Sequence, residues 1–81
     1  MTAPVALIFG AGANVGLAVA KKFNDEGYKC AGVARAPTDD LKKVAATTIA
    51  ADLSKPEEVD RVFEEVEAEL GPPSIVIYNG W

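Results

Sequence analysis

The sequence has 81 residues and a mass of 8.5 kDa, so we expect one small domain that spans residues 1–81. Hydrophobic residues make up 49% of the chain and charged residues 25%, a balance typical of folded domains and not of disordered ones. The formal net charge of −4 argues against a nucleic-acid partner, because phosphate binding needs clustered basic residues.

Missing residue types exclude several kinds of site. The chain has no histidine, which rules out Ser–His and Cys–His nucleophilic pairs, and its single cysteine, Cys30, cannot form an intrachain disulfide. One cysteine without histidine also excludes the common zinc sites, so we expect no metal. No apolar run approaches the length of a membrane span, and the N-terminus lacks the pattern of a signal peptide. We therefore expect a cytoplasmic protein with no membrane partner.

The first half of the chain alternates strand and helix patterns. Residues 5–9 form a continuous apolar run, which is typical of a strand covered on both faces in a parallel sheet. A glycine-rich turn over residues 10–16 leads into a helix to about Glu26, with Gly27 at its C-terminal cap. Residues 29–35 form a second strand, in which we expect Cys30 to be a buried small hydrophobe. The residues that we expect on the buried face of this helix are Val15, Ala18, Val19 and Phe23.

The second half continues the alternation. Thr38 is placed to cap a short helix that runs to about Ala46, and residues 47–51 form a third strand. Ser54 and Glu57 fit a capping box for a helix that ends near residue 70, before a fourth strand over 74–79. The acidic residues of this helix are interpreted as a solvated face. Its apolar stripe consists of Val59, Val62, Phe63, Val66 and Leu70.

This order of four strands and three helices, with short connections, predicts a fold class. Alternating strands and helices favour a parallel sheet with right-handed crossovers and helices on both faces. The sequence therefore predicts a doubly wound α/β unit.

The turn after the first strand has the spacing G-x-G-x-x-x-G, formed by Gly10, Gly12 and Gly16. Gly10 allows a sharp exit from the strand, Gly12 removes a Cβ where phosphates approach, and Gly16 lets the helix lie close to the sheet. Backbone N–H groups at such a helix N-terminus bind a dinucleotide pyrophosphate well. The alternative is a tight turn with a structural role only, which the position between a buried strand and an amphipathic helix disfavours.

Arg35 follows the second strand, where an NAD site usually carries Asp or Glu for the ribose hydroxyls. A guanidinium can instead pair with a 2′-phosphate and stack on adenine, so NADP(H) is favoured over NAD(H). The missing acid also disfavours S-adenosylmethionine as the ligand of a methyltransferase-like protein. The alternative is a surface arginine without a ligand.

Four stretches resemble the N-terminal half of the short-chain dehydrogenase/reductase family. They are the glycine turn, in which Asn14 replaces a family glycine, Arg35, the segment 51–54, and the segment 78–81, which is similar to the family's N-N-A-G. Asn tolerates a left-handed conformation, whereas Trp81 departs from the final glycine. The resemblance implies a Rossmann-like doubly wound parallel sheet, truncated to four strands in the order 3-2-1-4. The cofactor-binding residues that it implies are Gly10, Gly12, Asn14, Val15, Gly16, Arg35, Asp52, Leu53, Asn79 and Gly80.

The family's catalytic serine and its Tyr-x-x-x-Lys motif lie after the fourth strand, and we find no copy of the motif within these 81 residues. Tyr28 is followed four residues later by Gly32, and Tyr78 has no fourth successor. We therefore expect an NADP(H)-binding portion of an oxidoreductase that is inactive alone and has no catalytic residue. The alternative is a non-catalytic NADP(H) sensor or interaction module of the same fold. An apolar strand at the sheet edge, residues 75–79, also predicts self-association.

Overall fold

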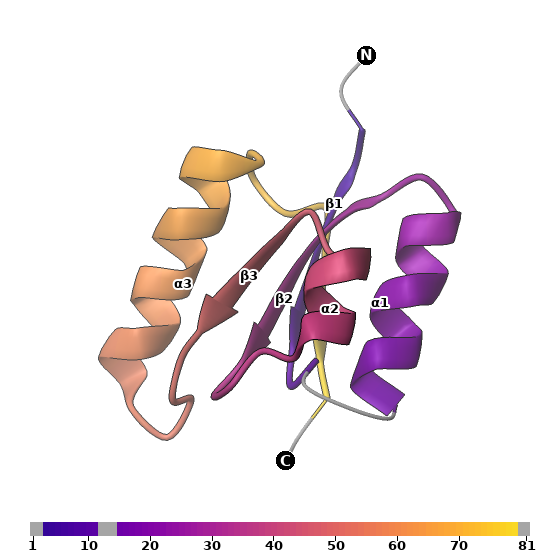
Figure 1. Ribbon diagram of the computed structural model, residues 1–81. Coiled ribbons are helices and arrows are strands. Elements are labelled where there is room, and N and C mark those ends of the chain that lie inside the picture. Colours follow the sequence, from indigo (N-terminus) through magenta and orange to yellow (C-terminus); the bar gives the residue numbers. More distant parts are fainter. Residues whose placement is uncertain (1–2, 12–14, 80–81) are drawn as a thin grey trace.

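Strands and helices alternate along the chain in the computed structural model, which describes residues 3–11 and 15–79. The strands form one parallel sheet in the order β3-β2-β1-β4, as predicted (Figure 1). Parallel pairing in this order makes a Rossmann-like α/β fold. The elements are β1 (Val5–Phe9), α1 (Val15–Asp25), β2 (Lys29–Ala34), α2 (Asp39–Val44), β3 (Thr47–Ala50), α3 (Pro56–Glu69) and β4 (Ile75–Tyr78).

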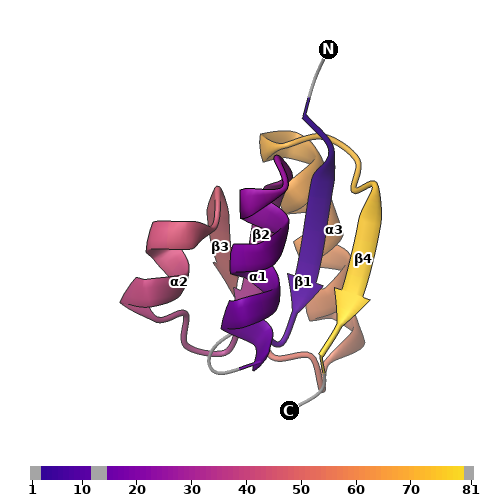
Figure 2. The same cartoon turned by 90° about the vertical axis from the view of Figure 1, so that its right-hand side faces the viewer.

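Helices cover both faces of the sheet. α1 and α2 lie on one face and α3 on the other, which the two views show together (Figures 1 and 2). Successive side chains of β1 point to opposite faces, so Leu7 packs under α3 whereas Ile8 packs under α1 and α2. Both residues are fully buried. This two-sided burial explains why β1 is apolar throughout and does not alternate.

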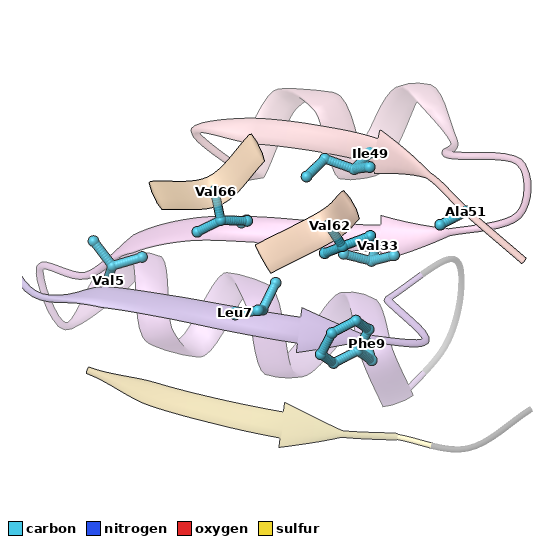
Figure 3. Packing of buried hydrophobic residues seen from close by; sticks show 9 residues of the cluster. Val5, Leu7, Phe9, Val33, Ile49, Ala51, Val62 and Val66 are labelled. Carbon is cyan, nitrogen blue, oxygen red and sulfur yellow. The ribbon is translucent and has the colours of Figure 1, made fainter. Parts of the chain in front are cut away.

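The α3 face carries the larger hydrophobic cluster. Val62 and Val66 of α3 lie over β1, β2 and β3 (Figure 3), and both are fully buried. The rest of the predicted apolar stripe packs at the margin of this cluster, so the periodicity of this helix is confirmed. The cluster consists of Val5, Leu7, Phe9, Ala31, Val33, Ile49, Ala51, Val62 and Val66, with Leu53, Val59, Phe63 and Leu70 packed against it.

The predicted buried face of α1 is partly wrong. Val15 is 64% exposed and Ala18 is exposed, whereas the fully covered positions are Gly16 and Ala20. Val19 and Phe23 do pack against the second cluster. Gly16 and Ala20 lie one helical turn apart and are small, so the axis of α1 can approach the sheet closely. This close approach turns Val15 outward. Cys30 is buried as expected, and its Sγ lies 3.4 Å from the carbonyl oxygen of Ala20.

The two predicted helix starts have different outcomes. Thr38 caps α2, because its Oγ1 accepts a hydrogen bond from the Leu41 amide at 3.2 Å. The capping box at Ser54 is wrong: the N-cap of α3 is Lys55, which makes no side-chain cap hydrogen bond. The hydroxyl of Ser54 donates to Asp52 instead, at 2.7 Å. A bond to the preceding carboxylate therefore replaces the expected helix cap.

Strand β4 forms one edge of the sheet and pairs with β1. Its side chains are unusually exposed for an apolar strand, at 36% for Ile75, 47% for Val76 and 69% for Tyr78. The described structure therefore has the apolar edge that the sequence predicts.

We expect Val33→Ala to lower the free energy of unfolding by about 2 kcal/mol, because it deletes two buried methyl groups and leaves a cavity. Val33 is fully buried in β2. The matched control is Val76→Ala, the same change in a half-exposed strand position, for which we expect a loss of about 0.5 kcal/mol or less. Urea unfolding followed by far-UV circular dichroism measures both. Equal losses in the two variants would contradict the assignment of the core.

Candidate functional site

The described site residues lie at one end of the sheet, just after the strands. Gly10 follows β1, Arg35 follows β2, Asp52 comes shortly after β3 and Asn79 follows β4. The carboxyl ends of parallel strands meet at the same edge, at the bottom of both views (Figures 1 and 2). The strand order reverses between β1 and β4, and such switch points are where open α/β sheets bind ligands.

Hydrogen bonds join the Gly10 turn to both neighbouring strands. The amides of Gly10 and Ala11 both donate to the Val33 carbonyl, at 2.9 and 3.0 Å. The Gly10 carbonyl in turn accepts a hydrogen bond from Asn79 Nδ2 at 3.2 Å. The φ of Gly10 is 79°, a left-handed conformation that favours glycine. The turn is therefore fixed at the switch point between β1 and β4.

Gly16 allows α1 to approach this turn closely. A Cβ built on Gly16 would lie 2.2 Å from the Gly10 carbonyl oxygen and 2.8 Å from Ala11 Cα, so no other residue fits without movement. The start of α1 is consequently held beside the turn. Val15, the first residue of α1, is exposed there. Gly12, Asn14 and Gly80 lie outside the described residues.

Asp52 and Arg35 lie close enough to interact electrostatically. Asp52 Oδ1 accepts hydrogen bonds from the Ser54 amide at 3.0 Å and from its hydroxyl at 2.7 Å. The Ser54 hydroxyl bond is the largest cause that lowers the pKa of Asp52, followed by the Ser54 amide bond. Desolvation opposes these two bonds, and the charges of Lys55 and Arg35 lower this pKa by smaller amounts. Asp52 is therefore ionised, and it lies near the exposed Arg35.

Leu53 lies between Asp52 and Ser54 in the loop that connects β3 to α3. Its side chain is half-buried and packs against the α3-face cluster. The side chain is therefore turned toward the core and away from the surface of the loop. The neighbouring Asp52 carboxylate stays on the surface of the same loop.

Two features of the site were not predicted from the sequence. One is the Val33 carbonyl, a backbone acceptor that no side-chain pattern could indicate. The other is Arg61, whose guanidinium contacts Glu58 and Glu65 and also donates to the Ala50 carbonyl at 2.8 Å. Acidic residues three before and four after the single basic residue of α3 were an available signal for these ion pairs.

Other kinds of site find little support in the described residues. Among them, no group of three or more His, Cys, Asp and Glu could hold a metal ion. Within the same residues, no helix has the length and apolar character needed to cross a membrane. An open hollow of about 470 Å³ lies at the opposite end of the sheet, near Pro4, Leu70 and Pro72. None of the sequence-predicted site residues lines it.

Residues 4–80 match the family model described as short chain dehydrogenase. The chain is 44% identical over 81 residues to the short chain dehydrogenase/reductase dmxR12 of Cryptosporiopsis sp. (strain 8999), covering 99% of this chain and 32% of that protein. It therefore spans about a third of the length of this curated relative.

Solved structures agree with this match. An L-sorbose reductase from Gluconobacter frateurii, complexed with NADPH and L-sorbose, is 33% identical with a TM-score of 0.85, covering 100% of this chain and 34% of that one. A 3-ketoacyl-(acyl-carrier-protein) reductase from Brucella melitensis, complexed with NADH, is 32% identical with a TM-score of 0.81. That alignment covers 93% of this chain and 33% of the reductase.

Replacing Ser54 by Ala is expected to raise the pKa of Asp52 toward its ordinary value, because the hydroxyl bond is the largest cause of the lowered pKa. Because the pKa of Asp52 is lower in the folded state than in the unfolded state, Asp52 stabilises the fold at pH values above its unfolded-state pKa. This stabilisation is lost as the pH falls through its folded-state pKa. Carboxyl ¹³C shifts measured against pH report the change. Ser74→Ala, at the far end of the sheet, is the matched control and should leave the Asp52 titration unchanged.

Proposed function

Since this chain belongs to the short-chain dehydrogenase family, we propose that it is the cofactor-binding portion of an oxidoreductase of this type and binds NADP(H) in preference to NAD(H). The observation that carries the proposal is the convergence of Gly10, Gly16 and Asn79 at the switch point of the sheet. The L-sorbose reductase with NADPH and the ketoacyl reductase with NADH, both over 30% identical, support a nicotinamide dinucleotide as the ligand.

The residues present fit such a ligand. Gly16 has no side chain where α1 approaches the Gly10 turn, and the backbone amides at the start of this helix would hold the pyrophosphate together with Gly12 and Asn14. Val15 is exposed at the same place and would contact the bound cofactor. The cofactor itself supplies the hydride chemistry, whereas the protein binds and orients it.

The adenine end of the cofactor would lie over the ends of β2 and β3. Both recorded hydrogen bonds of the Asp52 side chain end on Oδ1, so Oδ2 is the oxygen assigned to the adenine amino group. The Leu53 peptide group would bond to the ring beside it. At the other end, Asn79 and Gly80 would line the ribose next to the nicotinamide.

Arg35 supports the preference for NADP(H). It is exposed directly after β2 and near Asp52, so it stands where the adenosine ribose would lie. A guanidinium offers a planar pair of donors to a 2′-phosphate, whereas the usual carboxylate for two ribose hydroxyls is missing from this position.

We assign binding, and not proton transfer, to these 81 residues. None of their tyrosines is followed four residues later by a lysine, which is the pair that the family uses to protonate a carbonyl. The chain also spans about a third of the length of its curated relative, so we assign the reaction and the substrate to the whole protein and not to this portion by itself.

Arg35→Ala tests the choice of cofactor. We expect the dissociation constant for NADPH to rise at least about tenfold, because a charge-assisted bidentate contact is lost, and that for NADH to change little. Fluorescence titration of the reduced cofactors measures both constants. Lys29→Ala removes the same charge from the opposite end of β2 and serves as the matched control. An equal loss for both cofactors, or no loss, would contradict the role of Arg35.

The β4 edge is proposed to pair with a second copy of the chain. Its exposed apolar side chains and edge backbone groups suit strand-to-strand pairing about a twofold axis, which is self-complementary. The net charge of −4 opposes association, but residues 71–79 carry no charge, so the repulsion is weak at the contact itself.

Sedimentation velocity at increasing protein concentration tests this pairing. We expect the wild-type chain to show a concentration-dependent dimer, and Val76→Lys to remove it by placing a charge on the edge. Ala68→Lys adds the same charge to the exposed side of α3 and should leave the dimer intact. A strictly monomeric wild-type profile at high concentration would refute the proposal.

A further inference from the structure

The outer edge of β3 leaves two peptide groups without a strand partner. β3 is an edge strand, and its register pairs Ala50 with Ala34 of β2. The Ala51 amide faces β2 and donates to the Ala34 carbonyl at 3.1 Å. Peptide groups alternate in direction along a strand, so the Ala50 carbonyl and the Asp52 amide both point away from the sheet.

Two side chains of α3 face these peptide groups. Arg61 Nη2 donates to the Ala50 carbonyl oxygen at 2.8 Å. The Arg61 bond is the largest cause that lowers the pKa of Glu58, and the nearby backbone amide of Asp52 lowers this pKa further. The two side chains are also joined to each other, since Arg61 Nε lies 2.9 Å from Glu58 Oε2. Glu65 contacts the remaining side of the guanidinium at 2.9 Å.

This arrangement resembles the edge of a parallel strand. In a parallel pair, one residue donates to a carbonyl and accepts from the amide two residues further along its neighbour. Arg61 supplies that donor to Ala50, and the Glu58 carboxylate lies near the Asp52 amide, in the place of that acceptor. These contacts therefore continue past the end of β3, up to the residue that carries the site carboxylate.

We propose that the Glu58–Arg61 pair substitutes for a neighbouring strand and, by fixing the backbone of residues 50–52, positions the adenine end of the nucleotide site. The inference rests on the proposed function. Because Ser54 binds the Asp52 carboxylate within its own loop, the position of the carboxylate depends on where the loop backbone is held. Glu58 and Arg61 are positioning residues, since neither touches the ligand itself.

The exposure of the pair separates this role from general stabilisation. The side chains of Arg61 and Glu58 are 39% and 28% exposed, and ion pairs at such positions contribute little to the free energy of folding. Removing them should therefore leave the fold intact while the loop becomes free to move.

The test uses two small probes, adenosine 2′-monophosphate for the adenine end and nicotinamide mononucleotide for the other end. We expect Arg61→Met and Glu58→Ala to raise the dissociation constant of the adenosine probe about tenfold, the size of loss seen when groups that orient a ligating residue are removed. The constant for the nicotinamide probe should stay unchanged. Titrations followed by ¹H–¹⁵N NMR measure both constants.

Two further variants provide the controls. Glu58→Gln keeps an oxygen that can accept from the Asp52 amide, so it should retain most of the affinity that Glu58→Ala loses. Glu65→Ala removes one contact of Arg61 without touching the loop, so it should bind both probes like the wild type. Slower hydrogen exchange of the Asp52 amide in wild type than in Arg61→Met would show the fixed backbone directly.

The outcomes are distinguishable. A wild-type chain that binds neither probe would refute the proposed function. A wild-type chain that binds the adenosine probe, with Arg61→Met binding it equally well, would overturn the positioning role while leaving the proposed function standing. An equal loss for both probes in a folded Arg61→Met variant would assign the pair a structural role only and would also overturn the inference.

Discussion

The carbonyl group of Gly10 connects the elements that meet at the centre of this fold. It accepts a hydrogen bond from the side-chain amide of Asn79 at the end of β4. It also lies so close to the start of α1 that position 16 has room only for glycine. The amide of the same residue bonds to β2 through the Val33 carbonyl. The amide and carbonyl groups of one residue thus couple the turn to three neighbouring elements, so the start of α1 depends on the correct pairing of the sheet.

The two edges of the sheet differ in how they meet solvent. At the β3 edge, Arg61 bonds to the outward carbonyl of Ala50 and Glu58 lies near the Asp52 amide, so the edge is partly covered by charged side chains of α3. At the β4 edge, the described residues leave Val76 and Tyr78 exposed. Charged residues on an edge discourage pairing with other chains, whereas an apolar edge invites it. The same small sheet therefore has one edge partly covered by charged side chains and one exposed apolar edge.

Much of the fold follows from local patterns. The continuous apolar run of β1 and the apolar stripe of α3 could be predicted because the hydrophobicity of a residue is a property of its own side chain. Thr38 caps α2 by a bond within four residues, so it could be predicted. The buried face of α1 could not be predicted in this way. How closely α1 approaches the sheet depends on the Gly10 carbonyl, which lies outside the helix. Ser54 is a related case, since Asp52 competes with the helix amides for its hydroxyl.

The sequence by itself determined the order of the elements, the parallel sheet and the glycine turn, because hydrophobic periodicity and backbone freedom are local properties. It also singled out Arg35 through its place after a strand and Asp52 through a family resemblance, and the structure brings their charges near one another. Tertiary structure alone decided that Asn79 bonds to Gly10, and that Arg61 bonds to the edge of β3. These contacts join residues of different elements and depend on register and helix placement, which are set only when the whole sheet has formed.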